Sequence, residues 1–243
     1  MGNFEGVGFV REMILRGKAK AVYRGSDEDS LFIRFNDDTT AFDGEKAAVL
    51  PGKGAINAEI SAFIYRYLAE NGIATHLIDM VDENTALVRR AEIIMIEVIV
   101  RNIAAGGFSR KYGIAEGSPL KNTIIEFGLK DDALHDPMIN ESQITAIGLA
   151  SADELAEMSR QANRINELLT PLFDNAGIIL VDFKLEFGRY GGGIILCDEI
   201  SPDSCRLWDK STMEKLDKDR FRRDLGDVLF GYRQVLNRIK GIE

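Results

Sequence analysis

Cysteine, histidine and tryptophan are scarce in this chain of 243 residues, which contains two, two and one of them. Cys197 and Cys205 do not form a Cys-x-x-Cys pair, and His76 and His135 stand apart from them and from each other. A structural zinc site needs about four such ligands, usually at short spacings, and a disulfide framework needs several cysteine pairs. The sequence therefore argues against zinc and thiol chemistry.

Long apolar runs and an excess of positive charge are also missing. No apolar run approaches the roughly 18 residues of a membrane span, and the N-terminus lacks the basic and apolar regions of a signal peptide. The formal net charge of −9 disfavours broad contact with nucleic acid or with an anionic membrane. We expect a cytoplasmic protein that binds neither nucleic acid nor membranes.

Hydrophobic residues make up 45% of the chain, enough for a sizeable core in one large domain or two closely apposed lobes. Residue periodicity and turn signals predict the elements in chain order. The first are three strands within residues 13–35, a solvated connection that includes residues 51–55, a helix over 56–68 with one apolar face, strands near 76–78 and 85–90, and a buried strand at 93–100 that is apolar on both faces. The next are an irregular, solvated segment at 113–147, a helix from the capping box at 151–154 to a stop at Gly177, two strands within 178–197, and a helix over 219–240 whose inward-facing residues include Leu225.

Residues 178–209 hold the highest density of potential chemistry. The first strand of this stretch alternates between two sets of side chains. The apolar set is Val181, Phe183, Leu185 and Phe187, and the charged set is Asp182, Lys184 and Glu186. A glycine-rich reversal at 189–193 then leads to an apolar run that ends in Asp198 and Glu199.

A charged strand face often simply meets water, but two features here favour a binding site. Like charges on neighbouring strands repel each other, so Glu186 and Asp198 together suggest a divalent metal site. Arg206 follows in a loop of small polar residues, where a guanidinium group is suited to an anion.

Two other segments are basic at places where backbone could approach a ligand. Lys18 and Lys20 follow Gly17 at a tight corner that could face a polyphosphate, although the Walker A spacing is absent and the signal is weak by itself. Residues 101–111 combine alanine and glycine with Arg101 and two further basic side chains. This segment predicts either a phosphate site or a plain basic loop.

A series of motifs spans the chain from about residue 12 to 240 and resembles, in order and spacing, the motifs of the SAICAR synthetase family. These motifs lie at residues 17–20, 38–41, 101–106, 136–141, 181–188, 198–203, 206–209 and 217–222. The resemblance implies a carbon–nitrogen ligase of purine biosynthesis, which uses ATP to join L-aspartate to carboxyaminoimidazole ribonucleotide (CAIR) and forms SAICAR, ADP and phosphate. It also implies a two-lobed α+β fold of antiparallel sheets and packed helices, related to ATP-grasp and kinase-like folds, and a homo-oligomer.

The resemblance also implies where the sites lie. It divides the chain into an N-terminal β-rich nucleotide-binding lobe, residues 1–97, and a C-terminal α+β lobe, residues 98–243, with the ribonucleotide and metal sites. The implied catalytic residues are Lys184, Glu186 and Asp198, of which Glu186 and Asp198 would hold Mg²⁺. The implied ATP contacts are Lys18, Lys20, Arg89, Ile93 and Glu97. The implied substrate contacts are Arg101, Gly107, Ser109, Arg206 and Asp209.

A carboxylate is a poor electrophile, so we expect the γ-phosphoryl group to move onto it first and give an acyl phosphate. Two positions depart from the family pattern: Gly107 replaces a usual serine, and Ala58 follows Asn57 where many bacterial members carry a second asparagine. The alternative functions are a small-molecule kinase and a non-catalytic nucleotide sensor. The missing His-Arg-Asp loop argues against the kinase, and intact Lys184 and Glu186 argue against the sensor.

Overall fold

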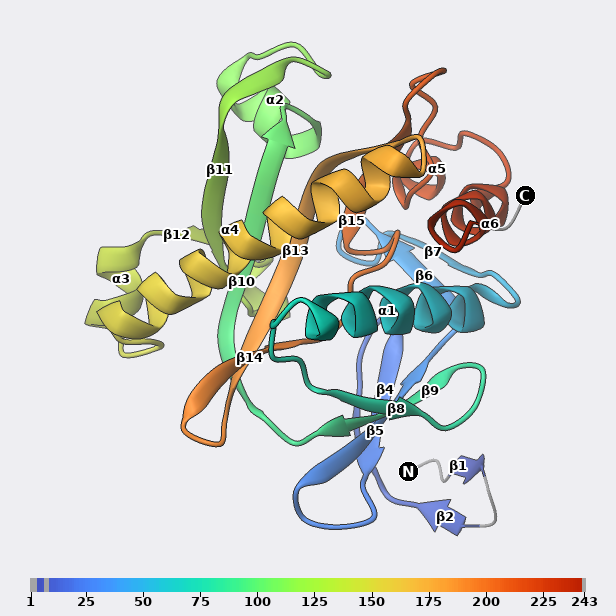
Figure 1. Ribbon diagram of the computed structural model, residues 1–243, viewed down its shortest axis with the longest axis vertical. Helices are drawn as coiled ribbons and strands as arrows, with labels where there is room; N and C mark the ends of the chain where they lie inside the picture. Colours follow the sequence, from blue (N-terminus) through green and yellow to red (C-terminus); the bar gives the residue numbers. More distant parts are fainter. Residues whose placement is uncertain (1–3, 7–8, 242–243) are drawn as a thin grey trace.

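The computed structural model describes residues 4–6 and 9–241, and its main elements are two antiparallel sheets with packed helices (Figure 1). The sheet nearer the N-terminus has the strand order β3-β4-β5-β9-β8. Its strands are β3 (Met13–Arg16), β4 (Lys20–Arg24), β5 (Ser30–Phe35), β9 (Thr85–Arg89) and β8 (Leu77–Met80). The three strands predicted within residues 13–35 are confirmed.

The central sheet has the order β12-β11-β10-β13-β14, and β15 also pairs with β13. Its strands are β12 (Met138–Ile139), β11 (Pro119–Leu129), β10 (Glu92–Ile103), β13 (Ile178–Tyr190), β14 (Gly193–Cys197) and β15 (Cys205–Asp209). The smaller elements are the hairpins β1 (Phe4–Gly6)–β2 (Phe9–Arg11) and β6 (Asp38–Ala41)–β7 (Lys46–Val49), the helices α2 (Gly106–Tyr112), α3 (Glu141–Ala146) and α5 (Asp219–Arg222), and the 3₁₀ turn η1 (Asp132–Leu134). The predicted α+β class with antiparallel sheets is confirmed.

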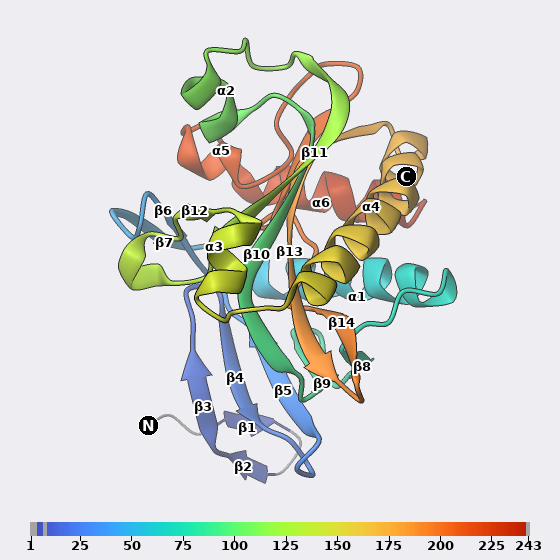
Figure 2. The ribbon, with the colours of Figure 1, turned by 90° about the vertical axis from the view of Figure 1, so that its left-hand side faces the viewer.

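Helix α4 (Ala152–Asn175) covers one face of β10 and β13, as Figure 2 shows. The helix starts at the predicted capping box, in which the Ser151 hydroxyl accepts from the Glu154 N–H and the Glu154 carboxylate accepts from the Ser151 N–H at 2.8 Å. It ends before Gly177, whose φ of 67° lies in the left-handed region that favours glycine. Because α4 and the core occupy this face, the charged side chains of β13 are left to the opposite face.

Helix α1 (Lys53–Glu70) connects the two sheets and also contacts α6 (Val228–Ile239) (Figure 1). Its predicted apolar face is confirmed, since Ile60, Ile64 and Leu68 are fully buried in the main core. The segment just before β8 pairs directly with β14: the Leu196 N–H donates to Ala74 O at 2.9 Å, and the His76 N–H donates to Leu196 O at 2.8 Å.

The predicted lobe boundary after residue 97 falls inside a continuous strand, β10. The division into lobes at that residue stays a prediction. Within the described part of the chain, no helix is long and apolar enough to span a membrane.

Two strand predictions for the central sheet are wrong. Strand β10 is not buried on both faces, because Ile93 and Met95 are 38% and 46% exposed while Ile94 and Ile96 are buried. Val181 does not share a face with Phe183, because the pairing of β13 with β15 shifts register between Leu180 and Asp182. Such an irregularity breaks the two-residue alternation of side chains, and Val181 packs instead against Ala105 and Trp208.

Two other segments also differ from prediction. Residues 113–147 are not irregular, because they contain β11, β12 and α3. The helix predicted over 219–240 is two helices, separated at residues 223–227. Asp224 and Gly226 have φ angles of 54° and 89°, which no α-helix contains, and Asp227 caps the second helix. Leu225, predicted to face inward, is therefore 44% exposed.

Candidate functional site

A cleft of about 470 Å³ lies between the N-terminal sheet and the charged face of the central sheet. One end is apolar and the other is charged. The apolar lining is Ile14, Leu15, Val22, Leu31, Ile33, Val88 and Ile93, and the charged lining includes Lys18, Lys20, Glu97, Lys130, Lys184, Glu186, Asp198, Glu199 and Lys218. An apolar wall beside concentrated charge suits a ligand with a flat ring and a polyphosphate.

The charged residues form a network, here called the lysine–carboxylate cluster: Lys20, Glu97, Lys130, Lys184, Glu186, Asp198 and Glu199. Glu97 and Glu186 are directly opposite each other on β10 and β13. Lys184 Nζ bridges them, at 2.7 Å from an oxygen of each. Lys130 adds a second ammonium group 2.9 Å from Glu186. Without these lysines the two opposed carboxylates would repel each other.

Lys20 reaches the same region from β4 and pairs with both Asp198 and Glu199. Burial disfavours its charge, but the attraction of these two carboxylates outweighs burial and raises the pKa of Lys20. Burial likewise favours neutral Asp198, yet Lys20 and Lys184 outweigh it and hold the pKa of Asp198 below its usual range. Lys20 and Asp198 are therefore both charged at neutral pH.

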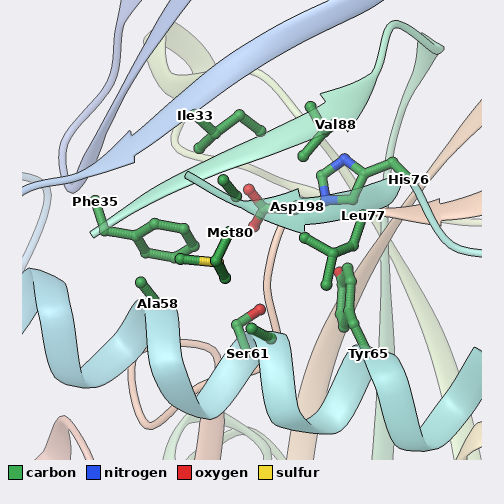
Figure 3. A pocket seen from close by; sticks show the side chains of 12 residues that line it. Ile33, Phe35, Ala58, Ser61, Tyr65, His76, Leu77, Met80, Val88 and Asp198 are labelled. Atoms are coloured by element: carbon green, nitrogen blue, oxygen red, sulfur yellow. The ribbon is translucent and has the colours of Figure 1, made fainter. Parts of the chain in front are cut away.

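Asp198 is held in a strained backbone conformation at the end of β14. Its φ is 64°, in the left-handed region that only a few non-glycine residues adopt. Helix α1 fixes the flanking residues, because the Tyr65 hydroxyl donates to Cys197 O at 2.6 Å and the Ile200 N–H donates to the Ser61 hydroxyl at 3.3 Å. Figure 3 shows Asp198 above this helix, close to His76. Helix α1 thus sets the position of the carboxylate in the cleft.

All five residues predicted to contact ATP line this cleft: Lys18, Lys20, Arg89, Ile93 and Glu97. Lys18 pairs across the cleft with Asp132 at 2.7 Å. Arg89 donates to the backbone oxygens of residues 75 and 77, so its guanidinium group is partly engaged by the protein itself.

A second group, here called the arginine cluster, is built around Asp182: Arg101, Arg206, Asp219 and Glu126. Arg101 and Arg206 each donate to Asp182 Oδ2 at 2.8 Å. Their Nε atoms donate to Glu126 at 2.5 Å and to Asp219 at 3.2 Å respectively. Burial works against the charge of Arg206, but Asp182 and Asp219 raise its pKa further. Both guanidinium groups are thereby held in defined orientations.

Helix α2 begins against this cluster. A Cβ on Gly106 would lie 2.4 Å from Arg206 Nη2, so a larger residue would displace that arginine. Ser109 is buried, and its hydroxyl has no hydrogen-bond partner among the described residues. Gly107 is exposed, and a Cβ there would meet only Arg110 Nη2, at 4.0 Å. The predicted substrate contacts Arg101, Gly107, Ser109 and Arg206 therefore gather in one place, outside the cleft lining.

Asp209 is the predicted site residue that the structure places neither in the cleft lining nor at the arginine cluster. Its oxygens accept from the Ser211 and Thr212 backbone and pair with Arg238 at 2.6 Å. These contacts organise the turn after β15, and they lower the pKa of Asp209, chiefly through the Ser211 hydroxyl.

Sequence reasoning missed several residues of the cleft. Lys130 and Asp132 lie in the segment predicted to be irregular and solvated, and Lys53 lies in a segment predicted to be a solvated connection. Lys53 is instead 1% exposed and pairs with Asp203 at 2.6 Å. The density of aspartates around residue 132 was the signal that could have found this part of the site.

The donor set of the lysine–carboxylate cluster fits a hard cation. Glu186 and Asp198 are carboxylates on one cleft, and Mg²⁺ in nucleotide sites typically takes one or two carboxylates together with phosphate oxygens. Among the residues described, no group of three or more His, Cys, Asp and Glu is arranged to hold a metal ion by itself. Repulsion between the two carboxylates does not by itself demand a metal, because lysines already compensate it.

Comparisons with known proteins agree with one another. The family model described as SAICAR synthetase matches residues 13–239. A phosphoribosylaminoimidazole-succinocarboxamide synthase from Clostridium botulinum strain Hall is 47% identical over 94% of this chain and 98% of its own length. The crystal structure of the enzyme of that name from Ehrlichia chaffeensis superposes with a TM-score of 0.93 at 44% identity, over 96% of this chain and 100% of that one. A SAICAR synthetase solved in complex with ADP gives a TM-score of 0.92 at 43% identity, over 96% and 99%.

Proposed function

The chain belongs to the SAICAR synthetase family, and from this premise we propose that its cleft uses ATP to join the amine of L-aspartate to the carboxylate of CAIR. It is an ATP-dependent ligase of purine biosynthesis. The proposal concerns where each substrate binds and which residues act. The observation that carries it is the arrangement of the two clusters on one face of β13, with Asp182 in one and Lys184 in the other. Residues two apart on a strand are separated by roughly 7 Å, about the span of a small substrate.

ATP occupies the cleft. Its adenine packs on the apolar end, near Val88 and Ile93, and its phosphates extend to Lys18 and Lys20. Binding replaces existing ion pairs, because Lys18 leaves Asp132 and Lys20 shares its charge between Asp198 and the phosphates. Both ammonium groups already lie in the cleft, so ATP binding exchanges their partners and does not have to bring the cations together.

CAIR binds with its phosphate on the arginine cluster. Arg101 and Arg206 offer planar donor groups that match phosphate oxygens, and the buried Ser109 hydroxyl and the exposed Gly107 N–H lie on the adjacent helix. The carboxylate of CAIR then points along β13 toward Lys184.

Lys184 is placed to hold the γ-phosphoryl group against that carboxylate. Transfer forms a bond from a carboxylate oxygen to phosphorus and breaks the bond to the ADP oxygen, which gives an acyl phosphate. The aspartate amine then attacks the acyl carbon, phosphate leaves, and the amine proton passes to a base in the cleft. Every reactant is anionic, so the lysines act by charge and position.

Mg²⁺ fits Glu186 and Asp198, and when bound it supplies positive charge to the phosphate oxygens of ATP. The two carboxylates would hold it, while Lys20, Lys130 and Lys184 would keep the remaining charge balanced. A cytoplasmic location and a homo-oligomeric state are also part of this proposal, on family resemblance.

The test is a coupled assay of ADP release with MgATP, L-aspartate and CAIR, from which each substrate is omitted in turn. The proposal expects release only when all three are present, together with a succinocarboxamide product. Release without L-aspartate would indicate a kinase, and no release with the full mixture would indicate a nucleotide sensor.

A further inference from the structure

Five lysines line the cleft, and four of them are ion-paired: Lys18, Lys20, Lys130 and Lys184. The fifth, Lys218, is different. It is half-buried, and its ammonium group makes neither an ion pair nor a hydrogen bond with any residue in the described ranges 4–6 and 9–241. A partly buried charge without a partner is costly, which is unusual unless a ligand supplies the partner.

Asp203, the carboxylate that attracts the Lys218 ammonium group most strongly, does not fill that role. Asp203 accepts from Lys53 at 2.6 Å, from Asn57 at 2.9 Å and from the Tyr232 hydroxyl at 2.6 Å. These three donors satisfy Asp203 from the side of α1 and α6. Burial lowers the pKa of Lys218, and the attraction of Asp203 does not outweigh it.

Lys218 lies between the two clusters along the cleft. On one side the lining continues through Ser204 to Glu199, the partner of Lys20. On the other side the next residue in the chain, Asp219, receives the hydrogen bond from Arg206. An anion on Lys218 would therefore sit between the phosphoryl-transfer lysines and the arginine cluster.

We propose that Lys218 binds a carboxylate of a substrate and that this position is part of the subsite where the amide bond forms. The inference rests on the proposed function, which already provides cations for the phosphates: Lys18 and Lys20 for ATP, Arg101 and Arg206 for the ribonucleotide. The proposed function assigns no cation to the carboxylates of L-aspartate, and it places only Lys184 near the carboxylate of CAIR. A single ammonium group matches the charge of a carboxylate better than that of a phosphate dianion.

Two substrates carry such a group, L-aspartate and CAIR, and steady-state kinetics distinguishes them. Lys218→Met keeps the aliphatic stem and removes the charge. Because a hydrogen bond to a charged group contributes about 1.5–3 kcal/mol, we expect kcat/KM to fall about 10- to 100-fold for the substrate concerned. Lys218→Arg should restore much of the loss. Lys210→Met is the matched control, since Lys210 pairs with Asp174 on the surface and should leave the kinetics unchanged.

A rise in the KM for L-aspartate alone would assign the carboxylate to the amino acid, and a rise for CAIR alone would assign it to the ribonucleotide. A rise confined to ATP, or unchanged kinetics in Lys218→Met, would overturn the proposal. Thermal denaturation of Lys218→Met distinguishes a binding role from a structural role. If Lys218 only binds substrate, the Tm of the variant should equal or exceed that of the wild-type protein, because the substitution removes an unpartnered charge. A markedly lower Tm would mean that Lys218 stabilises the fold. If the wild-type enzyme releases ADP only with all three substrates, the proposed function stands whatever Lys218→Met does.

Discussion

Glu186→Gln should nearly abolish turnover while it leaves binding of the ribonucleotide almost unchanged. The Glu186 carboxylate is 4% exposed and accepts from Lys184 at 2.7 Å and from Lys130 at 2.9 Å. Glutamine keeps the shape but leaves two partly exposed ammonium groups without the counter-charge that they share. Removing one partner of a buried pair costs about 3 kcal/mol or more of stability. For a chain of this size that is a fall in Tm of roughly 6–12 °C.

The effect on activity follows from the same geometry. Lys184 would turn toward Glu97, its remaining partner, and the metal would lose one of its two carboxylates. Loss of one preorganised electrostatic group at a reacting centre typically costs about 10²–10³ in kcat. ADP release with saturating substrates measures this loss.

Binding of the ribonucleotide can be followed separately through Trp208, the single tryptophan of the chain. It packs against Ala105, which directly precedes the helix at the arginine cluster. Glu167→Gln is the control, because that carboxylate is exposed on α4 and pairs only with Arg164 among the described residues. Near-normal turnover in folded Glu186→Gln, or an equal loss in the control, would refute the assignment of Glu186.

Three further predictions test the rest of the site. Arg206→Lys should raise the KM for CAIR about 10- to 100-fold with a smaller change in kcat, since lysine cannot reproduce the bidentate contact of a guanidinium group with the CAIR phosphate. An unchanged KM for CAIR would show that Arg206 is not part of the phosphate site. The pKa of His76 is lowered to about 4, chiefly by burial. Between about pH 6.5 and pH 4 the unfolded chain therefore binds more protons than the folded protein, and the free energy of unfolding should fall as the pH drops through that window. An NMR titration that protonates His76 in the folded protein near pH 6 would contradict this. Tyr232→Phe removes the hydroxyl that donates to Asp203 at 2.6 Å. The loss of this hydrogen bond should reduce the free energy of unfolding by about 2 kcal/mol and lower Tm by roughly 4–8 °C. An unchanged Tm in a thermal melt would show that the hydrogen bond does not stabilise the fold.

The sequence by itself determined the local elements and the family. The alternation along β13, the capping box of α4 and the apolar face of α1 were all predictable, because each depends on side-chain periodicity within one segment. The family was also within reach, since its chemistry resides in short motifs whose residues can be recognised without knowing how they meet. Where a local irregularity intervened, as at the register shift near Leu180 or the break at Gly226, the periodic prediction was wrong.

Only the tertiary structure decided which charges meet. Lys20 and Asp198 are 178 residues apart, and Lys53 and Asp203 are 150 apart. These pairs exist because α1 packs between two sheets and brings the ends of β4 and β14 together. The same packing leaves the Lys218 ammonium group without an ion-pair partner among the residues that the structure describes. Side-chain periodicity is a property of one segment and can be seen in the sequence. The counter-charge of a buried ionised group, in contrast, comes from whichever distant segment the packing of the core brings within a few ångströms.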